Sequence, residues 1–267
     1  MLRKIAILTV LTVLAMTATM AADSASAALN IGTFGKLGLS EEEFNSSIRS
    51  SNAWNDAKHS KDDFFKFYDS LSSMILGLDK GEVDEIDLPT IIGEYVLKMR
   101  PDFKVSCIVP VWPSDYVFGF IKGNTTLKDK FDEALTSIKN DGTLEYLQVH
   151  FLSGGENVEF SEFDGAETVK IGVTGDIPPV DYVNPYGKPA GFNIAILSEI
   201  ARRLKINVKL VHIDAGARAS ALASGRVDAV FWFHALNNND QLFDIPENVI
   251  ISKPYYSWSA YLHLSRR

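Results

Sequence analysis

The residues of this chain that are best suited to chemistry lie in a turn and at a strand end. Asp176 stands in the turn Gly175-Asp-Ile-Pro-Pro179, and His234 follows Trp232 and Phe233 at the end of an apolar run. A carboxylate, an imidazole and aromatic faces suit the recognition of a small polar or cationic solute. We predict that His234 contacts a ligand. Core packing is the alternative for Trp232 and Phe233, although strand alternation should turn at least one of them toward a cleft.

The sequence lacks the patterns that mark common catalytic centres. It has no HExxH, P-loop, nucleophile elbow or Cys/His pair, and nothing fixes two carboxylates at catalytic spacing. Its one cysteine, Cys107, excludes a disulfide framework and a cysteine-rich metal knuckle. We therefore predict no catalytic residue, no metal ligand and no cofactor, and we favour a binding protein over an enzyme.

The composition is that of an acidic globular protein. Of 267 residues, 46% are hydrophobic, and 34 Asp and Glu against 26 Lys and Arg give a net charge of −8. The chain is long enough for one large or two modest hydrophobic cores. Because an acidic chain without a basic run binds polyanions poorly, we expect neither nucleic acid nor an anionic membrane surface as a partner.

Residues 1–27 have the pattern of an export signal. Arg3 and Lys4 precede an apolar stretch, and Ala25-Ser-Ala27 offers the small-x-small site that a signal peptidase accepts. The stretch is short for a spanning helix, so a cleaved signal is favoured over an uncleaved anchor. No cysteine follows it, which excludes a lipid-anchored lipoprotein. We expect a soluble protein that is periplasmic or secreted.

Hydrophobic periodicity alternates between strand and helix patterns, which is typical of the α/β class. The last predicted strand is nearly all apolar, as in a buried parallel sheet, and ligand sites are expected at the carboxyl ends of such strands. Predicted strands cover 29–33, 83–88, 104–111, 116–121, 169–173, 208–211 and 227–233. Predicted helices follow the capping box at 40–43 and cover 64–78, 90–99, 125–139, 144–151, 192–204 and 217–223.

Two segments of the chain share one pattern. Residues 78–86 and 222–230 both read Leu-x-x-Gly-x-Val-Asp-x-Ile/Val. The pattern predicts a helix closed by a glycine and an abrupt entry into a buried strand. Such junctions are common in α/β proteins, but two copies in one chain indicate two similarly built lobes.

An ordered set of motifs runs through the carboxyl half: Val169-Lys-Ile-Gly-Val173, Gly175-Asp-Ile-Pro-Pro179, Asp181-Tyr182, Gly187-Lys-Pro-Ala-Gly191-Phe-Asn193, Ala221–Asp228 and Ser252-Lys-Pro-Tyr-Tyr256. In this order they resemble the family-3 extracellular solute-binding proteins, which serve ABC importers of polar amino acids. Segments 68–97, 118–120, 127–138 and 141–144 resemble the second lobe and the closing elements of that family. The resemblance implies a bilobal periplasmic-binding-protein-like fold.

The order of these parts is unusual for that family. We infer a circularly permuted α/β fold with lobe 2 at 28–115, the closing strand and helices of lobe 1 at 116–152, a linker at 153–167 and the main part of lobe 1 at 168–267. One covalent strand would then join the lobes, which predicts a looser hinge. A monomer is favoured over a domain-swapped dimer on loop length.

The resemblance implies a solute site between the lobes. Asp87 stands where the family's ammonium acceptor would fall, and an N-cap of the next helix is the alternative. Gly35 and Lys36 approximate the turn that binds the solute carboxylate at a helix start. Asp176 lies in the first ligand loop, where capping the turn is the alternative, and Ile177 occupies the position of a stacking aromatic.

The carboxylate-binding arginine of the family is missing, since no Arg occurs between Arg226 and Arg266 and Asn237-Asn-Asn-Asp240 stands in its place. Arg218 is the candidate substitute, and a solvated helix residue is the alternative. Either the solute is not a standard α-amino acid or its carboxylate is bound differently. Aromatic walls would suit a cyclic, aromatic or cationic solute.

Together these implications predict a protein that captures an amino acid or a related small polar compound and delivers it to the permease of an ABC importer. Two alternatives stay open. One is a ligand-sensing module that acts in trans on a membrane receptor, and the other is a dehydratase-like enzyme on the same fold.

Overall fold

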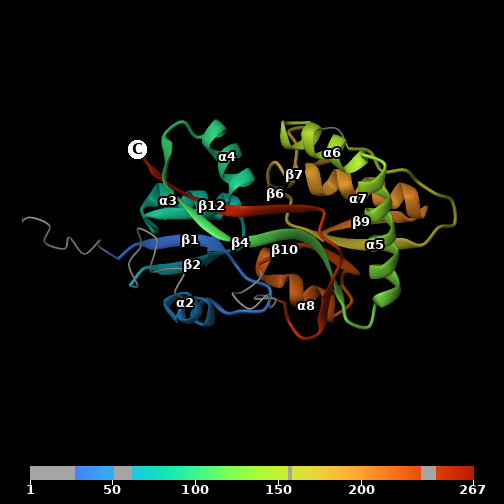
Figure 1. Cartoon of the computed structure of the whole chain (residues 1–267), viewed down its shortest axis with the longest axis horizontal. Coiled ribbons are helices and arrows are strands. Elements are labelled where there is room, and N and C mark those ends of the chain that lie inside the picture. The colour runs from blue at the N-terminus through green and yellow to red at the C-terminus, as the bar shows by residue number, and fades with distance from the viewer. Residues whose placement is uncertain (1–27, 51–61, 156–157, 236–244) are drawn as a thin grey trace, which may run out of the picture.

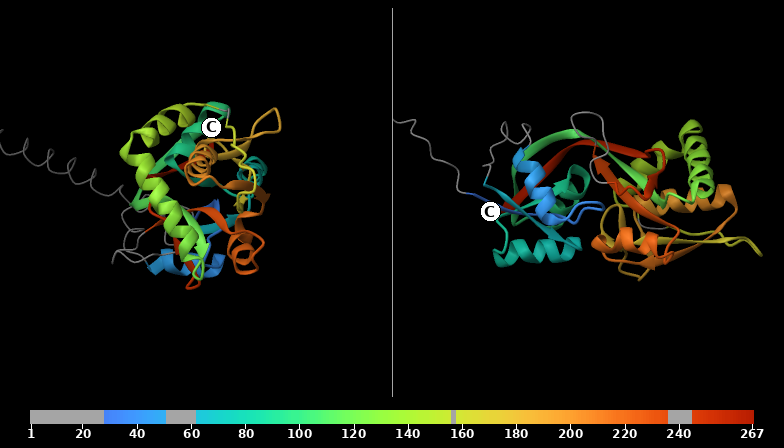
Figure 2. Two further views of the ribbon diagram at one scale, coloured as in Figure 1. Left: turned by 90° about the vertical axis from the view of Figure 1, so that its right-hand side faces the viewer. Right: turned by 90° about the horizontal axis from the view of Figure 1, so that it is seen from below.

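A computed structural model describes residues 28–50, 62–155, 158–235 and 245–267. The predicted signal peptide, at 1–27, and the segment 237–240 lie outside these residues. The described chain forms two groups of helices and strands joined by long strands (Figures 1 and 2), and the predicted α/β class is confirmed. Within the described residues, no helix combines the length and the apolar character needed to cross a membrane.

The lobe that comes first in the chain, predicted above as lobe 2 and called the first lobe from here on, is built on parallel strands that alternate with helices. Strand β1 (Asn30–Phe34) lies between β2 (Phe64–Tyr68) and β3 (Glu85–Pro89) and is parallel to both. Its helices are α2 (Glu41–Ser50), α3 (Leu71–Lys80) and α4 (Thr90–Met99). The predicted capping box begins α2, since the Ser40 N–H donates to Glu43 Oε2 at 2.8 Å and the Glu43 N–H donates to Ser40 Oγ at 3.3 Å.

The second lobe, predicted above as lobe 1, repeats this plan further along the chain. Strand β5 (Thr168–Val173) lies between β9 (Asn207–His212) and β10 (Ala229–Ala235) and is parallel to both. Its helices are α5 (Thr125–Asn140), α6 (Thr143–Leu152), α7 (Phe192–Leu204), a short 3-10 turn η2 (Ala215–Ala217) and α8 (Arg218–Ala223). A small antiparallel sheet of β6 (Asp176–Ile177), β7 (Asp181–Val183) and β8 (Pro189–Ala190) follows β5.

Two long strands pass between the lobes. Strand β4 (Phe103–Ile121) pairs with β10 at its end, and β12 (Tyr256–Arg266) runs antiparallel to it and pairs with β3. Apart from β6, β7 and β8, the described strands therefore form one nine-stranded sheet, in which β11 (Val249–Ile251) also pairs with β4. The expectation of a single covalent connection is wrong, because β12 returns the chain to the first lobe. The circular permutation and the lobe boundaries stay predictions.

Two sequence predictions about elements need correction. Residues 64–68 form strand β2 and not the start of a helix, because pairing with β1 outweighs their helical spacing. Helix α3 begins after Ser70, whose Oγ accepts the N–H of Ser73 at 3.0 Å. The two strands predicted at 104–111 and 116–121 are one strand, β4, which continues through Pro113 between them.

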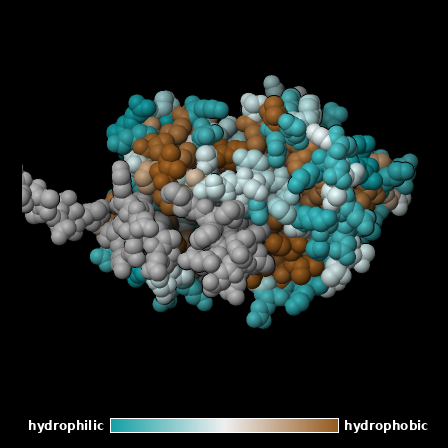
Figure 3. Space-filling model, viewed as in Figure 1, coloured by the Kyte–Doolittle hydropathy of each residue, from teal (hydrophilic) through white to brown (hydrophobic). Residues whose placement is uncertain are grey.

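The amphipathic helix predicted at 125–139 is confirmed as α5. Its apolar side is buried in the core, and the buried residues include Leu127, Phe131, Leu135 and Ile138. On the face seen in Figure 3, the side of the second lobe where α5 lies is largely hydrophilic. This division between an apolar and a polar face fixes the orientation of α5 on the lobe.

Candidate functional site

The two lobes meet beyond the carboxyl ends of their parallel strands. In the first lobe, β2 ends at Tyr68 and α3 begins at Leu71; in the second, β5 ends at Val173 and leads to β6. The N–H of Ser72 donates to Oδ2 of Asp176 at 3.2 Å, and the N–H of Ala215 donates to the carbonyl of Asp69 at 3.4 Å. These bonds join residues that are distant in sequence, so they form a direct contact between the two lobes.

Asp176 is a side chain that makes a hydrogen bond across this lobe contact. Its Oδ2 accepts the Ser72 N–H in the first turn of α3, where the helix dipole favours a negative charge. Its Oδ1 is buried and has no hydrogen-bond partner within the described part of the chain. Burial raises the pKa of this carboxyl, and the hydrogen bonds at the start of α3 oppose that shift. The alternative that Asp176 only caps its own turn does not explain this bond, because its partner Ser72 belongs to the other lobe.

Arg218 places a buried positive charge in the second lobe beside Ala215, which is part of the lobe contact. Its guanidinium carbon lies 4.8 Å from the centroid of the Trp232 ring, and Nη1 donates to the carbonyl of Ala215 at 3.3 Å. Only 6% of Arg218 is exposed, so the alternative of a solvated helix residue is wrong. A buried guanidinium with a fixed fork of donors is suited to a carboxylate.

Asp181 is the counter-charge near Arg218 and was not among the predicted site residues. Its Oδ2 accepts the N–H of Thr174 at 2.9 Å and the hydroxyl of Thr174 at 3.1 Å. Burial raises the pKa of Asp181, whereas Thr174 and the charge of Arg218 act in the opposite direction. The Asp181-Tyr182 motif was the signal in the sequence, but its burial depends on the small sheet that folds over β5.

Trp232 packs in a hydrophobic cluster to which both lobes contribute. The tryptophan is 2% exposed, and Leu37, from the loop after β1, belongs to the same cluster and is 8% exposed. Ile245, in the second lobe, packs against this cluster, and Gly38 lies beside Pro246. Leu37 therefore forms a second contact between the lobes, and Trp232 combines core packing with a ring face toward Arg218.

The first-lobe candidates point elsewhere. Asp87 Oδ1 lies 3.2 Å from Nε2 of His263, and Oδ2 accepts the hydroxyl of Thr33 at 3.2 Å. The N-cap alternative for Asp87 is wrong, because the cap position of α4 is Pro89 and makes no side-chain cap bond. The Nζ of Lys36 lies 4.7 Å from the Phe44 ring centroid, so this side chain faces α2.

The remaining candidates are placed as follows. The N–H of Gly35 donates to the carbonyl of Tyr68 at 3.2 Å, and Ile177 is buried in the main core. In β10, Phe233 is opposite Tyr116 and His234 is opposite Asp115 on β4. The side chains of Phe233 and His234 lie outside the described part of the structure. The structure thus brings Arg218 and Trp232 into contact and sets Asp176 at the lobe contact, whereas Asp87 contacts His263 and Thr33.

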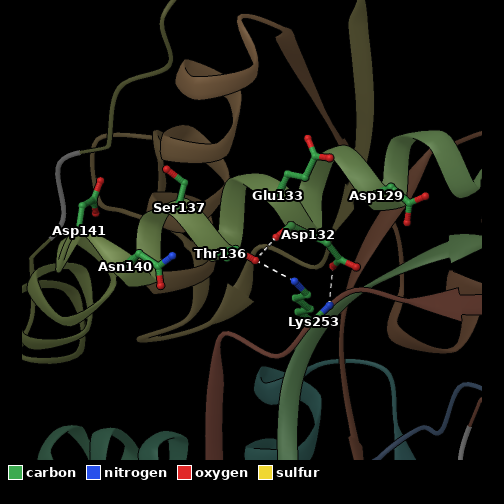
Figure 4. Close-up of a pocket in the computed structure, with 8 residues that line it drawn as sticks. All are labelled: Asp129, Asp132, Glu133, Thr136, Ser137, Asn140, Asp141 and Lys253. Carbon is green, nitrogen blue, oxygen red and sulfur yellow. Dashed lines mark hydrogen bonds between the residues drawn. The ribbon is translucent and has the colours of Figure 1, made fainter.

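The second lobe also contains two hollows. One, of about 780 Å³, runs along the outer side of α5, and half of its lining residues are acidic (Figure 4). Its lysine, Lys253, donates through Nζ to the Thr136 hydroxyl at 2.9 Å and through its backbone N–H to Asp132 at 2.6 Å. A smaller cavity of about 180 Å³ lies between β5, β9 and the small sheet, and Asp181 lines it. All residues that line the acidic hollow belong to the second lobe, so it is not a candidate for a site between the lobes.

Comparison with known proteins gives one family match. Residues 169–263 match the bacterial extracellular solute-binding proteins, family 3, so the predicted resemblance is confirmed over this segment. No curated protein sequence gives a significant match.

Several solved structures resemble the chain at low sequence identity. The ligand-binding component of an ABC-type import system from Staphylococcus aureus, solved with zinc bound, is 12% identical with a TM-score of 0.43; the match covers 90% of this chain and 66% of that one. The GluR0 ligand-binding core with L-glutamate is 12% identical with a TM-score of 0.39, covering 91% and 86%. A periplasmic substrate-binding protein of an ABC transporter from Coxiella burnetii is 14% identical with a TM-score of 0.38, covering 89% and 84%.

Proposed function

We propose that this chain, of which residues 169–263 match the bacterial extracellular solute-binding proteins of family 3, is a member of that family that captures a small polar solute between its two lobes and delivers it to an ABC importer. Membership of an extracellular family implies a periplasmic or secreted location. The solute, the amino acid-like character that we expect of it and the permease are parts of the proposal.

The observation that carries the proposal is the lobe contact between Asp176 and α3, with Arg218 buried on the same side of the second lobe. A zwitterionic solute needs an acceptor for its ammonium group and donors for its carboxylate. Asp176 Oδ1 is a buried acceptor with no hydrogen-bond partner among the described residues, and Arg218 supplies a guanidinium over the Trp232 ring. These groups supply both halves of such a recognition.

Lobe closure is the proposed mechanism. Because β4 and β12 both run from one lobe to the other, the hinge consists of two paired strands that bend together. A solute that contacts both lobes stabilises the closed form relative to the open one, and a permease that recognises the closed form then receives loaded protein. The solute shifts the balance between the open and closed forms because it binds the two forms with different affinity.

A thermal-shift panel of amino acids, amines and related cyclic solutes tests the proposal on the purified protein. A ligand at 100 times its Kd adds about 2.7 kcal/mol to the stability of the folded state, which raises the melting temperature measurably. The Arg218→Ala variant should lose the shift given by carboxylate-bearing solutes. The matched control is Arg202→Ala, because the side chain of Arg202 is 59% exposed on α7.

Three results would contradict the proposal. An equal shift in the Arg218→Ala variant and in the unaltered protein would remove Arg218 from the site. Turnover of a candidate substrate, without stabilisation by any solute, would favour the dehydratase-like enzyme instead. Stabilisation by a solute without binding to any permease would favour the sensing module.

A further inference from the structure

Four side chains with metal-binding chemistry meet on adjacent strands of the first lobe. Strand β12 lies between β3 and β4, and its residue His263 is paired with Asp87 on β3 and with Cys107 on β4. Glu85 lies two residues before Asp87, so both carboxylates project from the same face of β3. The cluster is therefore created by strand pairing between residues up to 178 positions apart in the chain.

The distances within the cluster are short. His263 Nδ1 lies 3.0 Å from Glu85 Oε2, and His263 Nε2 lies 3.2 Å from Asp87 Oδ1. One ligand atom each from Glu85, Cys107 and His263 lies within 4.8 Å of the other two. An ion placed among the three atoms would therefore need only small side-chain movements to contact all of them.

The burial of these groups creates a need for a cation. Glu85 and Asp87 are each 8% exposed, and two buried carboxylates require a compensating positive charge. In this structure His263, which is 1% exposed, lies between the two carboxylates. Cys107 is only half-buried and gives the cluster an opening toward solvent.

The donor set is specific for one class of ion. An imidazole, a thiolate and a carboxylate suit Zn²⁺ and similar transition-metal ions, whereas Mg²⁺ and Ca²⁺ prefer oxygen ligands throughout. We propose that Glu85, Cys107 and His263 bind a divalent transition-metal ion of the Zn²⁺ class through an oxygen, the sulfur and Nδ1. A fourth position is left for water.

Asp87 then acts as a positioning residue. A histidine that binds a metal through one nitrogen usually donates the other N–H to a carboxylate, which fixes the ring and its tautomer. Asp87 Oδ1 faces Nε2 of His263 in this manner, and Asp87 Oδ2 is itself held by the hydroxyl of Thr33 at 3.2 Å. The outer part of a metal site is therefore already assembled around the ring.

The sequence does not reveal this site, and we expected no metal ligand. The three ligands stand far apart in the chain and form no local motif, so neither spacing nor a Cys/His pair signals them. The rival interpretation is a structural ion triad of Glu85, His263 and Asp87, in which Cys107 is a bystander. The two interpretations differ in the role of the sulfur atom.

Titration of the metal-free, untagged protein with Co²⁺ distinguishes them. Cys107 is the one cysteine of the chain, so in a thiol-free buffer a thiolate-to-cobalt charge-transfer band in the near ultraviolet reports on that sulfur. We expect the band to saturate at one equivalent of Co²⁺ and to disappear when Zn²⁺ is added. The Cys107→Ser variant should lose the band while keeping its circular dichroism and melting temperature.

Two further variants test the assigned roles. Asp87→Asn should keep the band but bind Co²⁺ about 10- to 100-fold more weakly, as expected for a residue that orients a ligand. His150→Ala is the control, because His150 is exposed on α6 and stacks on Tyr146 away from the cluster. Its titration should match that of the unaltered protein.

The proposal fails if the unaltered protein shows no charge-transfer band at several equivalents of Co²⁺. It also fails if calorimetry gives the same Zn²⁺ affinity for the Cys107→Ser variant as for the unaltered protein, because the ion would then bind elsewhere. Neither measurement depends on solute binding, so the solute proposal can stand or fall separately.

Discussion

Asp84 in the first lobe and Asp228 in the second make the same pair of hydrogen bonds. The N–H of Asp84 donates to the carbonyl of Asn30 at 2.8 Å, and the N–H of Asn30 donates to Asp84 Oδ2 at 2.8 Å. Asp228 exchanges the same two bonds with Lys170, each also at 2.8 Å. Each aspartate thereby pins the start of one strand to the beginning of the strand beside it.

This relationship predicts an unequal cost of removing the two carboxylates. The bond to Asp228 is partly buried and the bond to Asp84 is exposed, so Asp228→Ala should lower the free energy of unfolding by about 1.5–3 kcal/mol and Asp84→Ala by less. Asp228→Asn keeps an acceptor oxygen and should cost less than Asp228→Ala. Urea denaturation measures all three. Equal losses for Asp228→Asn and Asp228→Ala would contradict the assigned role of the acceptor.

The glycines of the same repeat predict a second effect. Gly81 has a φ of 71° and Gly225 a φ of 69°, which side chains avoid, although a Cβ at either position would meet nothing within 4 Å. Gly81→Ala and Gly225→Ala should therefore each cost about 1–2 kcal/mol through backbone strain alone. Gly123→Ala is the control, because Gly123 has equal space without a positive φ. A cost as large for Gly123→Ala would show that the strain argument is wrong.

The outcome for this repeat shows why part of the fold is predictable. The pattern at 78–86 and 222–230 depends on neighbouring residues only, and the structure confirms both glycine-closed helices and the buried strands that follow. Helix α5 was predictable for the same reason, since its apolar spacing is sustained over four turns. Sequence patterns thus predicted these elements correctly because neighbouring residues alone determine whether they form.

Features that depend on tertiary pairing were not predictable in this way. Residues 64–68 have helical spacing but pair with β1, and the return of β12 to the first lobe has no local signal. The resemblance implied that Asp87 binds the ammonium group of the solute. Its partner in the structure, His263, lies on β12, a strand that no sequence motif predicted. Arg218, by contrast, was predicted from the sequence as the substitute for the family's missing arginine, and the structure buries it beside Trp232.

The contact between Asp176 and Ser72 predicts a change in lobe closure. Asp176→Ala removes the acceptor of the Ser72 N–H, so the ligand-free protein should open more often and show a larger radius of gyration in X-ray scattering. Asp129→Ala is the matched control, because the Asp129 side chain is 66% exposed on α5. A solute that binds should compact the unaltered protein, and no compaction by a bound solute would contradict the closing mechanism.

The ion triad around His263 predicts how stability varies with pH in the metal-free protein. Burial opposes protonation of the ring, but the hydrogen bonds to Asp87 and Glu85 outweigh it and raise the pKa of His263 from 6.5 to about 9. A group with a raised pKa stabilises the folded state fully below the pKa of its unfolded form, and that contribution is lost as the pH rises through the folded value. Urea denaturation in the presence of a chelator should therefore show stability falling between pH 6.5 and about 9. His263→Gln should be less stable at pH 6 and flatter across this range, whereas His150→Ala should follow the unaltered protein. A His263→Gln curve as steep as that of the unaltered protein would assign the pH dependence to another group.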